Sequence, residues 1–277
     1  EARALELPAV VIVFEPLPRE YLHPEKAPAR LMDFREKFQA LAALGVDRLL
    51  RIRFDESLRT MSAAAFVERI FVDGLGVKRL VLGDDFRFGR GREGDYDFLK
   101  AEGERHGFET LSTDTLALEG DRVSSTRVRE ALAEGDLELA AELVGRPYVI
   151  TGRVVQGRQL GRALGAPTAN VELNRLKAPL SGVFTVRVNG GGLIEAPGVA
   201  NVGTRPTVND GTRANLEVHL LEGEPQLYGK RIDVQFLHRL RPELKFDSLE
   251  DLKQAIHGDF AAAREWFAAR TMARYDA

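Results

Sequence analysis

The sequence lacks the features that mark several common classes of protein. None of its 277 residues is a cysteine, which excludes disulfide bonds, thiolate metal sites and thiol catalysis and fits a reducing cytoplasm. No run of 18 apolar residues occurs, so we expect no membrane-spanning helix. The 39 Lys and Arg residues are balanced by 42 Asp and Glu residues, which leaves no basic excess of the kind that nucleic-acid binding requires. We therefore expect a cytoplasmic protein that binds neither membranes nor nucleic acid.

The chain opens with a short helical pattern. Glu1–Leu7 has the composition of the last turns of a helix, which Pro8 would end. A domain rarely opens at the end of a helix. We therefore expect a further segment before Glu1, with a short terminal helix as the alternative.

The first half alternates between strand and helix patterns. Continuous β-branched runs are typical of strands buried on both faces of a parallel sheet, and apolar residues at three-to-four spacing are typical of amphipathic helices. The alternation predicts an α/β domain with an open parallel sheet covered by helices. The expected strands are Val10–Phe14, Arg48–Ile52, Arg79–Leu82 and one beginning near Gly107; the expected helices are Arg30–Leu44, capped by Gly45, Ala63–Asp73 and Phe98–His106.

The pattern changes near Arg146 and Pro147. Short strands separated by Gly, Pro and Asn follow, which predicts a small antiparallel β-barrel. We expect an α/β domain over residues 1–145 and a barrel domain with a C-terminal helix over residues 146–277. The expected strands are Tyr148–Val155, Gly182–Val188, Gly198–Val202, Asn215–Leu221 and Arg231–Leu237; the expected helices are Ser125–Glu134, Leu137–Val144 and Leu249–Ala268, the last capped by Ser248.

A stretch rich in glycine and arginine follows the first barrel strand. Between Gly152 and Asn170 it holds four glycines and three arginines, and such a loop lets backbone N–H groups and positive charge approach a phosphate. It is neither a Walker loop nor G-x-G-x-x-G, and an ordinary surface loop is the alternative. Thr168 and Asn170 end this stretch and offer a hydroxyl and an amide oxygen, which suit Mg²⁺ but also suit a structural turn.

A carboxylate stands in a later strand. In Leu216–Leu220 the alternation puts Glu217 and His219 on one face and the apolar residues on the other. Glu217 is a candidate base if it faces the phosphate loop, and a solvated side chain otherwise.

The motifs of the second half occur together, in order, between Tyr148 and Phe267. They are Gly-x-Val-x-x-Gly from Gly152, Gly-Arg-x-Leu-Gly-x-Pro-Thr-Ala-Asn from Gly161, Asn-Val-Gly-x-Arg-Pro-Thr from Asn201, Leu-Glu-Val-His from Leu216, Leu-Tyr-Gly-Lys from Leu227, and Leu-Arg-Pro-Glu-x-Lys-Phe-Asp-Ser-Leu-Glu-x-Leu from Leu240. As a set they resemble the signature of riboflavin kinases.

The resemblance implies a role for each position. Residues Gly157, Gly161 and Arg162 would lie over the ATP phosphates, and Thr168 and Asn170 would hold Mg²⁺ and the phosphates. Glu217 would accept the proton of the flavin's ribityl 5′-hydroxyl, and Arg241, Phe246 and Ser248 would lie near the flavin. His219 would be a structural neighbour, since one base suffices.

The first half resembles the FMN adenylyltransferase module of bacterial bifunctional FAD synthetases, a Rossmann-like nucleotidyltransferase fold. Phe14–Glu20, Gly83–Gly89 and Val123–Arg129 carry the resemblance. It implies that Gly83, Asp85, Phe86, Ser124, Ser125, Thr126, Arg127 and Arg129 bind the nucleotide. Without it, Ser124–Thr126 is an N-cap cluster, and the loop from Gly83 to Gly94 is an ordinary surface loop.

The family's His-x-Gly-His motif is absent from this sequence, and Leu17 stands where many relatives carry His. We expect the histidine motif to precede Glu1, together with one strand of the sheet. The resemblance implies that riboflavin, FMN and ATP are the substrates, that Mg²⁺ is the metal, and that the complete protein makes FMN and then FAD. The alternatives are a monofunctional riboflavin kinase with a degenerate first domain and a non-catalytic flavin-binding barrel.

Overall fold

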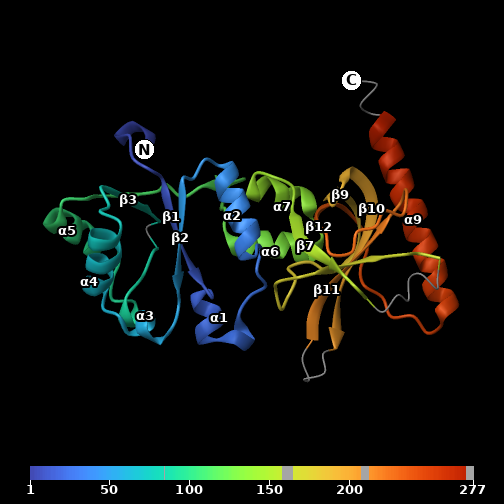
Figure 1. Ribbon diagram of the computed structural model, residues 1–277, viewed down its shortest axis with the longest axis horizontal. Coiled ribbons are helices and arrows are strands. Elements are labelled where there is room, and N and C mark those ends of the chain that lie inside the picture. Colours follow the sequence, from blue (N-terminus) through green and yellow to red (C-terminus); the bar gives the residue numbers. More distant parts are fainter. Residues whose placement is uncertain (84, 158–164, 207–211, 273–277) are drawn as a thin grey trace. The chain divides into compact units, whose positions relative to one another are not determined.

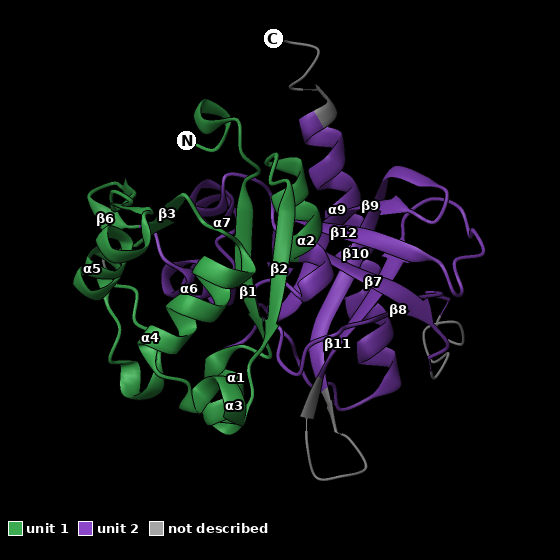
Figure 2. Cartoon of the chain, turned by 60° about the vertical axis from the view of Figure 1, so that its left-hand side comes forward, with its two compact units in different colours: residues 1–27, 37–122 green, residues 28–36, 123–277 purple. Residues whose placement is uncertain are grey.

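The computed structural model describes residues 1–83, 85–157, 165–206 and 212–272. By their contacts the residues divide into two compact units, drawn in green and purple in Figure 2. Unit 1 comprises residues 1–27 and 37–122, and unit 2 comprises residues 28–36 and 123–277. Within the described ranges, no helix combines the length and the apolar character needed to cross a membrane.

Unit 1 contains two parallel strand pairs, β1 with β2 and β3 with β4, and a short antiparallel pair, β5 with β6. Parallel pairs joined through helices are the predicted α/β architecture. The strands are β1 (Val10–Glu15), β2 (Arg48–Arg53), β3 (Arg79–Leu82), β4 (Glu109–Ser112), β5 (Ala117–Leu118) and β6 (Asp121–Arg122). The helices and helical turns are η1 (Arg3–Leu5), α1 (Pro18–Leu22), η2 (Pro24–Lys26), α3 (Glu56–Thr60), α4 (Ala63–Phe66), η3 (Val67–Gly74), η4 (Arg90–Arg92) and α5 (Tyr96–His106).

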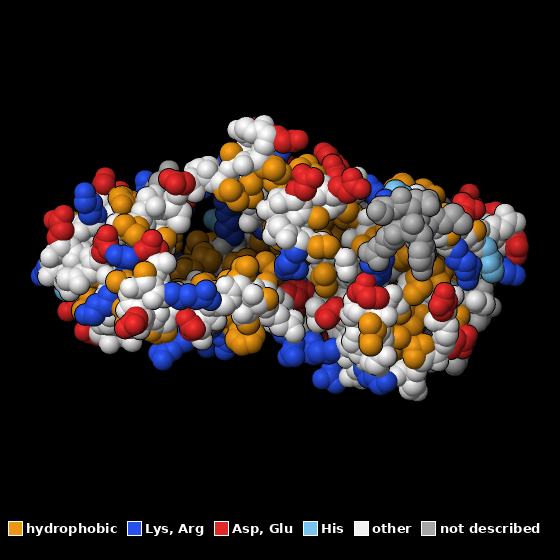
Figure 3. All heavy atoms as spheres, turned by 90° about the horizontal axis from the view of Figure 1, so that it is seen from above, with side chains coloured by type: hydrophobic (Ala, Val, Ile, Leu, Met, Phe, Trp, Pro, Cys, Tyr) orange, Lys and Arg blue, Asp and Glu red, His pale blue; other side chains and the backbone are white. Residues whose placement is uncertain are grey.

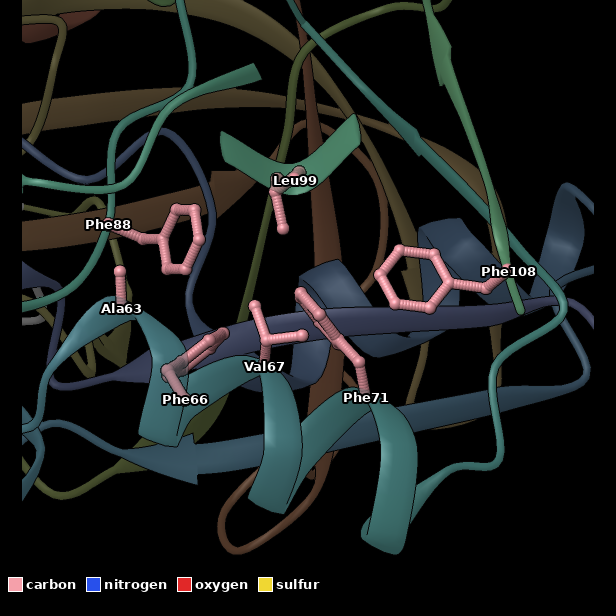
Figure 4. Packing of buried hydrophobic residues seen from close by; sticks show 7 residues of the cluster. All are labelled: Ala63, Phe66, Val67, Phe71, Phe88, Leu99 and Phe108. Carbon is pink, nitrogen blue, oxygen red and sulfur yellow. The ribbon is translucent and has the colours of Figure 1, made fainter. Parts of the chain in front are cut away.

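An aromatic core holds unit 1 together (Figure 4). Phe66 lies at its centre, with ring centroids 5.3 Å from Phe71 and 5.4 Å from Phe88. Side chains of both β1 and β3 pack on this cluster, so the two parallel pairs share one core. Its buried members are Ala63, Phe66, Val67, Phe71, Phe88, Leu99 and Phe108.

The helix expected over Arg30–Leu44 is shorter, because α2 spans Phe34–Ala43. A reciprocal capping box starts it: the Asp33 carboxylate accepts the Glu36 N–H at 2.8 Å, and the Glu36 carboxylate accepts the Asp33 N–H at 2.6 Å. Residues 27–33 are therefore irregular rather than helical. At the other end Gly45, at φ 78°, closes the helix as predicted, and the Val46 N–H donates to the Leu41 carbonyl.

Unit 2 is a closed six-stranded antiparallel barrel with the order β10-β11-β8-β7-β12-β9 (Figure 1). Helices α6 (Ser125–Glu134) and α7 (Leu137–Val144) precede it as predicted, and α9 (Leu249–Met272) follows it. Ser248 caps α9, since its hydroxyl accepts the Asp251 N–H at 3.1 Å. The strands are β7 (Val149–Val155), β8 (Ala169–Glu172), β9 (Gly182–Gly190), β10 (Leu193–Pro206), β11 (Thr212–Leu220) and β12 (Arg231–Arg241). Strand β8 is absent from the expected strands, because the pattern at Thr168 and Asn170 suits metal ligands or a structural turn and has no strand periodicity.

Alternation along the barrel strands separates an apolar interior from an outer face. Val154, Val171, Leu216 and Val202 stand opposite one another across four neighbouring strands and are at most 3% exposed. Helix α9 covers part of the outer face, where Phe260 and Ala263 pack against Val199 and its neighbours. The next outer position of β10 after Val199 is Asn201, which belongs to the polar row described below.

A buried polar cluster within unit 2 attaches residues 30–36 to the barrel. Arg175 donates to the Glu36 carboxylate, and the two side chains are 1% and 5% exposed. Arg175 also donates to the Leu31 carbonyl and the Tyr148 hydroxyl, and the Thr151 N–H donates to Glu36 at 2.7 Å. Burial raises the pKa of the Glu36 carboxyl, although Arg175 and the N–H donors oppose the shift. The stability of the Arg175–Glu36 ion pair therefore depends on each of these hydrogen-bond donors.

Replacing Arg175 by Met should destabilise unit 2, because it leaves the Glu36 carboxylate buried without its counter-charge. We expect Arg175→Met to lower the free energy of unfolding by about 3–5 kcal/mol. The matched control is Arg187→Met, which removes a more exposed ion pair with Glu195 and should cost about 0–1 kcal/mol. Urea unfolding followed by the fluorescence of the single tryptophan, Trp266 on α9, measures both. Equal losses in the two variants would contradict the role given to the buried pair.

Candidate functional site

A row of polar side chains crosses three strands on the outer face of the barrel. Glu217 of β11 stands opposite Asn170 of β8 on one side and opposite Asn201 of β10 on the other. Directly opposed residues share a face, so all three point to the same side of the sheet. Asn215, two residues before Glu217, donates its amide N–H to the Glu217 carboxylate at 3.1 Å. This polar row therefore places the Glu217 carboxylate among the side-chain amides of Asn170, Asn201 and Asn215 on the outer face of the barrel.

The loop after β7 begins against this row. A Cβ atom added to Gly157 would overlap the side-chain amide of Asn170. The backbone of residue 157 can therefore approach Asn170 only because it is glycine. Two other residues predicted to bind ATP, Gly161 and Arg162, lie outside the described residues.

A cavity of about 340 Å³ lies next to the row. Pro167, Thr168 and Ala169 form one wall, the end of β11 from Val218 a second, and residues 223–228 a third. The volume lies at the lower end of the range for small-molecule sites, and the walls mix apolar side chains with a few polar groups. Thr168 lies in the wall of the cavity, and two residues further along the chain Asn170 belongs to the polar row.

His219 lies in the cavity wall and is held on two sides. Its Nδ1 is 2.9 Å from the Pro167 carbonyl oxygen, and because a carbonyl only accepts, Nδ1 donates. Its ring stacks on Phe260 of α9 with centroids 3.9 Å apart and planes 11° apart. Burial lowers the pKa of His219, so the neutral ring is favoured.

The predicted flavin-binding residues lie where β12 meets α9. Arg241 makes a two-point ion pair with Asp259 of α9, both contacts at 2.8 Å, and its guanidinium lies 5.5 Å from the ring centroid of Phe246. Ser248 caps α9 and also contacts Asp251. The Arg241–Asp259 pair holds the helix to the barrel. The role of Arg241, Phe246 and Ser248 toward a flavin stays a prediction.

The residues predicted to bind the nucleotide of the adenylyltransferase fall in both units. In unit 1, the Gly83 carbonyl accepts the Phe86 N–H in a turn, Phe86 stacks on Phe88, and exposed Asp85 pairs with Arg122. In unit 2, the Ser124 hydroxyl accepts the Arg127 N–H at the start of α6, as its N-cap pattern predicts. Ser125 and Thr126 are exposed in the first turn, and Arg129 donates to the Ser125 and Ala29 carbonyls.

Sequence reasoning did not identify Asn201, Asn215 or residues 223–228 as parts of the site. Asn201 and Asn215 lie in strands whose pairing alone brings them beside Glu217. Glu243 also lies over this face, because a Cβ atom added to Gly203 of β10 would overlap the Glu243 carboxylate. Acidic and basic side chains are interspersed on the face shown in Figure 3, in keeping with the balanced composition.

Comparison with known proteins finds similarity over almost the whole chain. The riboflavin kinase family matches residues 144–267, and the FAD synthetase family matches residues 1–127. The bifunctional riboflavin kinase/FMN adenylyltransferase of Pseudomonas fluorescens is 53% identical over 264 residues, covering 95% of this chain and 84% of the relative. The protein of the same description from Escherichia coli K12 is 49% identical over 267 residues, covering 96% and 85%. A crystal structure described as a macrolide-efflux protein from Streptococcus pneumoniae aligns with a TM-score of 0.77 and 29% identity, covering 96% and 86%.

The contact between residue 157 and Asn170 yields a prediction for ligand binding. We expect Gly157→Ala to weaken the binding of Mg²⁺ and a non-hydrolysable ATP analogue by about tenfold or more, because the new methyl group displaces the Asn170 amide. The matched control is Gly258→Ala on α9, where an added Cβ meets nothing within 4 Å. Isothermal titration calorimetry of the two variants makes the comparison. Unchanged affinity in Gly157→Ala would show that the polar row does not serve the nucleotide.

Proposed function

Because the chain belongs to the family of bifunctional riboflavin kinases/FMN adenylyltransferases, we propose that its polar row is the kinase site and that Glu217 is the catalytic base. The family phosphorylates riboflavin to FMN with ATP and adenylylates FMN to FAD, and the His-x-Gly-His motif expected for the second reaction is absent from this sequence. We assign the kinase to residues 146–277 and the adenylyltransferase to residues 1–145. The observation that carries the kinase proposal is the opposed pairing of Glu217 with Asn170, beside the Thr168 cavity.

Glu217 has the surroundings that a base for an alcohol needs. The Asn215 amide holds one carboxylate oxygen, and the outer face is open enough for Glu217 to be only partly buried. In the reaction, Glu217 takes the proton from the terminal ribityl hydroxyl as that oxygen forms a bond to the γ-phosphorus of ATP. The bond from the γ-phosphorus to the bridging oxygen then breaks and ADP leaves. Phosphoryl transfer needs mainly alignment and charge neutralisation, and one carboxylate supplies the proton acceptor.

ATP-dependent phosphoryl transfer also uses a divalent metal ion, and we propose Mg²⁺. The Thr168 hydroxyl and the Asn170 amide oxygen are hard-oxygen donors of the kind Mg²⁺ prefers. Among the described residues, no three His, Cys, Asp or Glu side chains gather as a metal site. Oxygens of the ATP phosphates would supply the other ligands of the ion. When bound, it would neutralise charge that develops on the transferring phosphate. Thr168 and Asn170 would orient those phosphates toward Glu217.

The cavity suits the nucleotide base. Its walls include Val218 and Leu227, and Thr168 lies within them. An adenine ring held against these walls would leave the phosphates beside the polar row and Gly157. We assign Gly157, Gly161 and Arg162 to the phosphates and Arg241, Phe246 and Ser248 to the flavin.

The adenylyltransferase assignment rests on residues of each unit taken separately. In unit 2, the start of α6 offers backbone N–H groups and hydroxyls with Arg127 and Arg129 nearby, a combination suited to phosphate. We therefore assign Ser124, Ser125, Thr126, Arg127 and Arg129 to a nucleotide phosphate. In unit 1, we assign the turn formed by Gly83, Asp85 and Phe86 to the same reaction.

Replacing the base should remove catalysis and leave binding intact. We expect Glu217→Gln to lower the kcat for FMN formation by about 10²–10⁴-fold, because glutamine still accepts the Asn215 hydrogen bond but cannot take a proton. Riboflavin affinity, measured by quenching of flavin fluorescence, should stay near that of the wild type. Glu195→Gln, at an exposed position, is the control. Turnover of Glu217→Gln within a few-fold of the wild type would remove the base assignment.

The hydroxyl of Thr168 should matter for ATP more than for the flavin. We expect Thr168→Ala to raise the KM for Mg²⁺·ATP about tenfold with little change in riboflavin affinity, because a hard-oxygen ligand is lost. Thr168→Ser keeps the hydroxyl and should stay close to the wild type. Steady-state kinetics with each substrate varied in turn measures both constants. A rise of both KM values together, or equal losses in Ser and Ala, would refute the assignment.

A further inference from the structure

Thr168 sits at the edge of the regular hydrogen bonding of the barrel. Strand β8 pairs with β11 from Ala169, which stands opposite Val218, and Asn170 follows opposite Glu217. Thr168 precedes the first of these pairs. The strand ladder therefore holds the chain on the C-terminal side of Thr168 and leaves its N-terminal side to another contact.

That other contact comes from His219. After Val218, His219 is the next residue of β11, and its Nδ1 donates to the Pro167 carbonyl at 2.9 Å. The ring of Pro167 already restricts its φ angle, and its peptide bond to Thr168 is planar. A hydrogen bond to the Pro167 carbonyl sets the orientation of that peptide plane, which is the remaining freedom. Together these constraints fix the position of the Thr168 Cα atom, from which the side chain extends.

The imidazole is itself held firmly. It stacks at 3.9 Å on Phe260, which is 8% exposed and belongs to the cluster between α9 and the outer face. Arg264 and Glu224 are the charged groups that act on it, with opposite effects on its pKa. The donor therefore has a fixed position, unlike one on a long exposed side chain.

We propose that His219 is a positioning residue for ATP: its hydrogen bond to Pro167 sets the Thr168 hydroxyl against the nucleotide. The inference rests on the proposed kinase site. It differs from a packing role in one respect, because packing requires only the ring on Phe260, whereas positioning requires the Nδ1–H donor.

Two substitutions with the same number of side-chain heavy atoms and the same branching at Cγ separate the roles. Asparagine places an amide N–H close to the position of Nδ1, and leucine has a similar shape with no donor. We expect His219→Leu to raise the KM for Mg²⁺·ATP about three- to tenfold, the effect of losing one hydrogen bond, with the KM for riboflavin near the wild-type value. His219→Asn should stay within about twofold of the wild type for both substrates. Both substitutions remove the ring that stacks on Phe260, and leucine keeps the better apolar contact, so a larger KM in His219→Leu than in His219→Asn reports the donor.

His238 supplies the matched control. It lies on β12 and stacks on Trp266 of α9, the helix that also carries Phe260, with ring centroids 5.9 Å apart. His238→Leu loses a similar aromatic contact with α9 and should leave the KM for Mg²⁺·ATP unchanged. Thermal unfolding of every variant shows how much stability each contact carries.

The outcomes are distinct. Equal rises in KM in His219→Asn and His219→Leu would mean that the ring packing matters and would overturn the proposal, as would no rise in either. A wild-type chain that forms no FMN from riboflavin and Mg²⁺·ATP would instead refute the proposed kinase site.

Discussion

The in-register pairing of β11 with β8 and β10 is the constraint on which the site depends. Because side chains alternate along a strand, one register puts Leu216 in the interior and Glu217 on the outer face beside Asn170 and Asn201. A shift of one residue would bury the carboxylate and expose the apolar row. The same interior row that stabilises the barrel therefore orients the candidate base, so stability and chemistry select the same register.

A buried ion pair imposes a second constraint on unit 2. Arg175 and Glu36 are 139 positions apart in the sequence, and their contact requires residues 30–36 to lie on the barrel. Burying both charges is costly, and the cost is offset only because the carboxylate also accepts two backbone N–H groups and the guanidinium also reaches a carbonyl and a hydroxyl. Such a cluster specifies one arrangement, because an alternative one would leave a charge buried without partners.

Local signals predicted much of the fold. Caps and apolar spacing alone predicted the C-terminus of α2 at Gly45, the N-terminus of α9 at Ser248, and the helices α6 and α7. Two errors have the same origin. The start of α2 was placed too early, because Leu31 fits the apolar spacing although its carbonyl accepts the Tyr148 hydroxyl from the barrel. Strand β8 was missed, because Ala169–Glu172 is short and becomes a strand only through its pairing with β7 and β11.

The sequence by itself determined the two kinds of architecture, the order of the motifs and the residue types that could serve phosphoryl transfer. Residue types and alternation made Glu217, Thr168 and Asn170 candidates, because these are local properties, and the family resemblance supplied the roles that are predicted for them. Only the tertiary structure decided that Asn201 and Asn215 flank the carboxylate, that Gly157 abuts Asn170, and that His219 holds Pro167. Barrel closure and strand register bring together residues that no sequence spacing relates, so contacts of this kind arise when the chain folds.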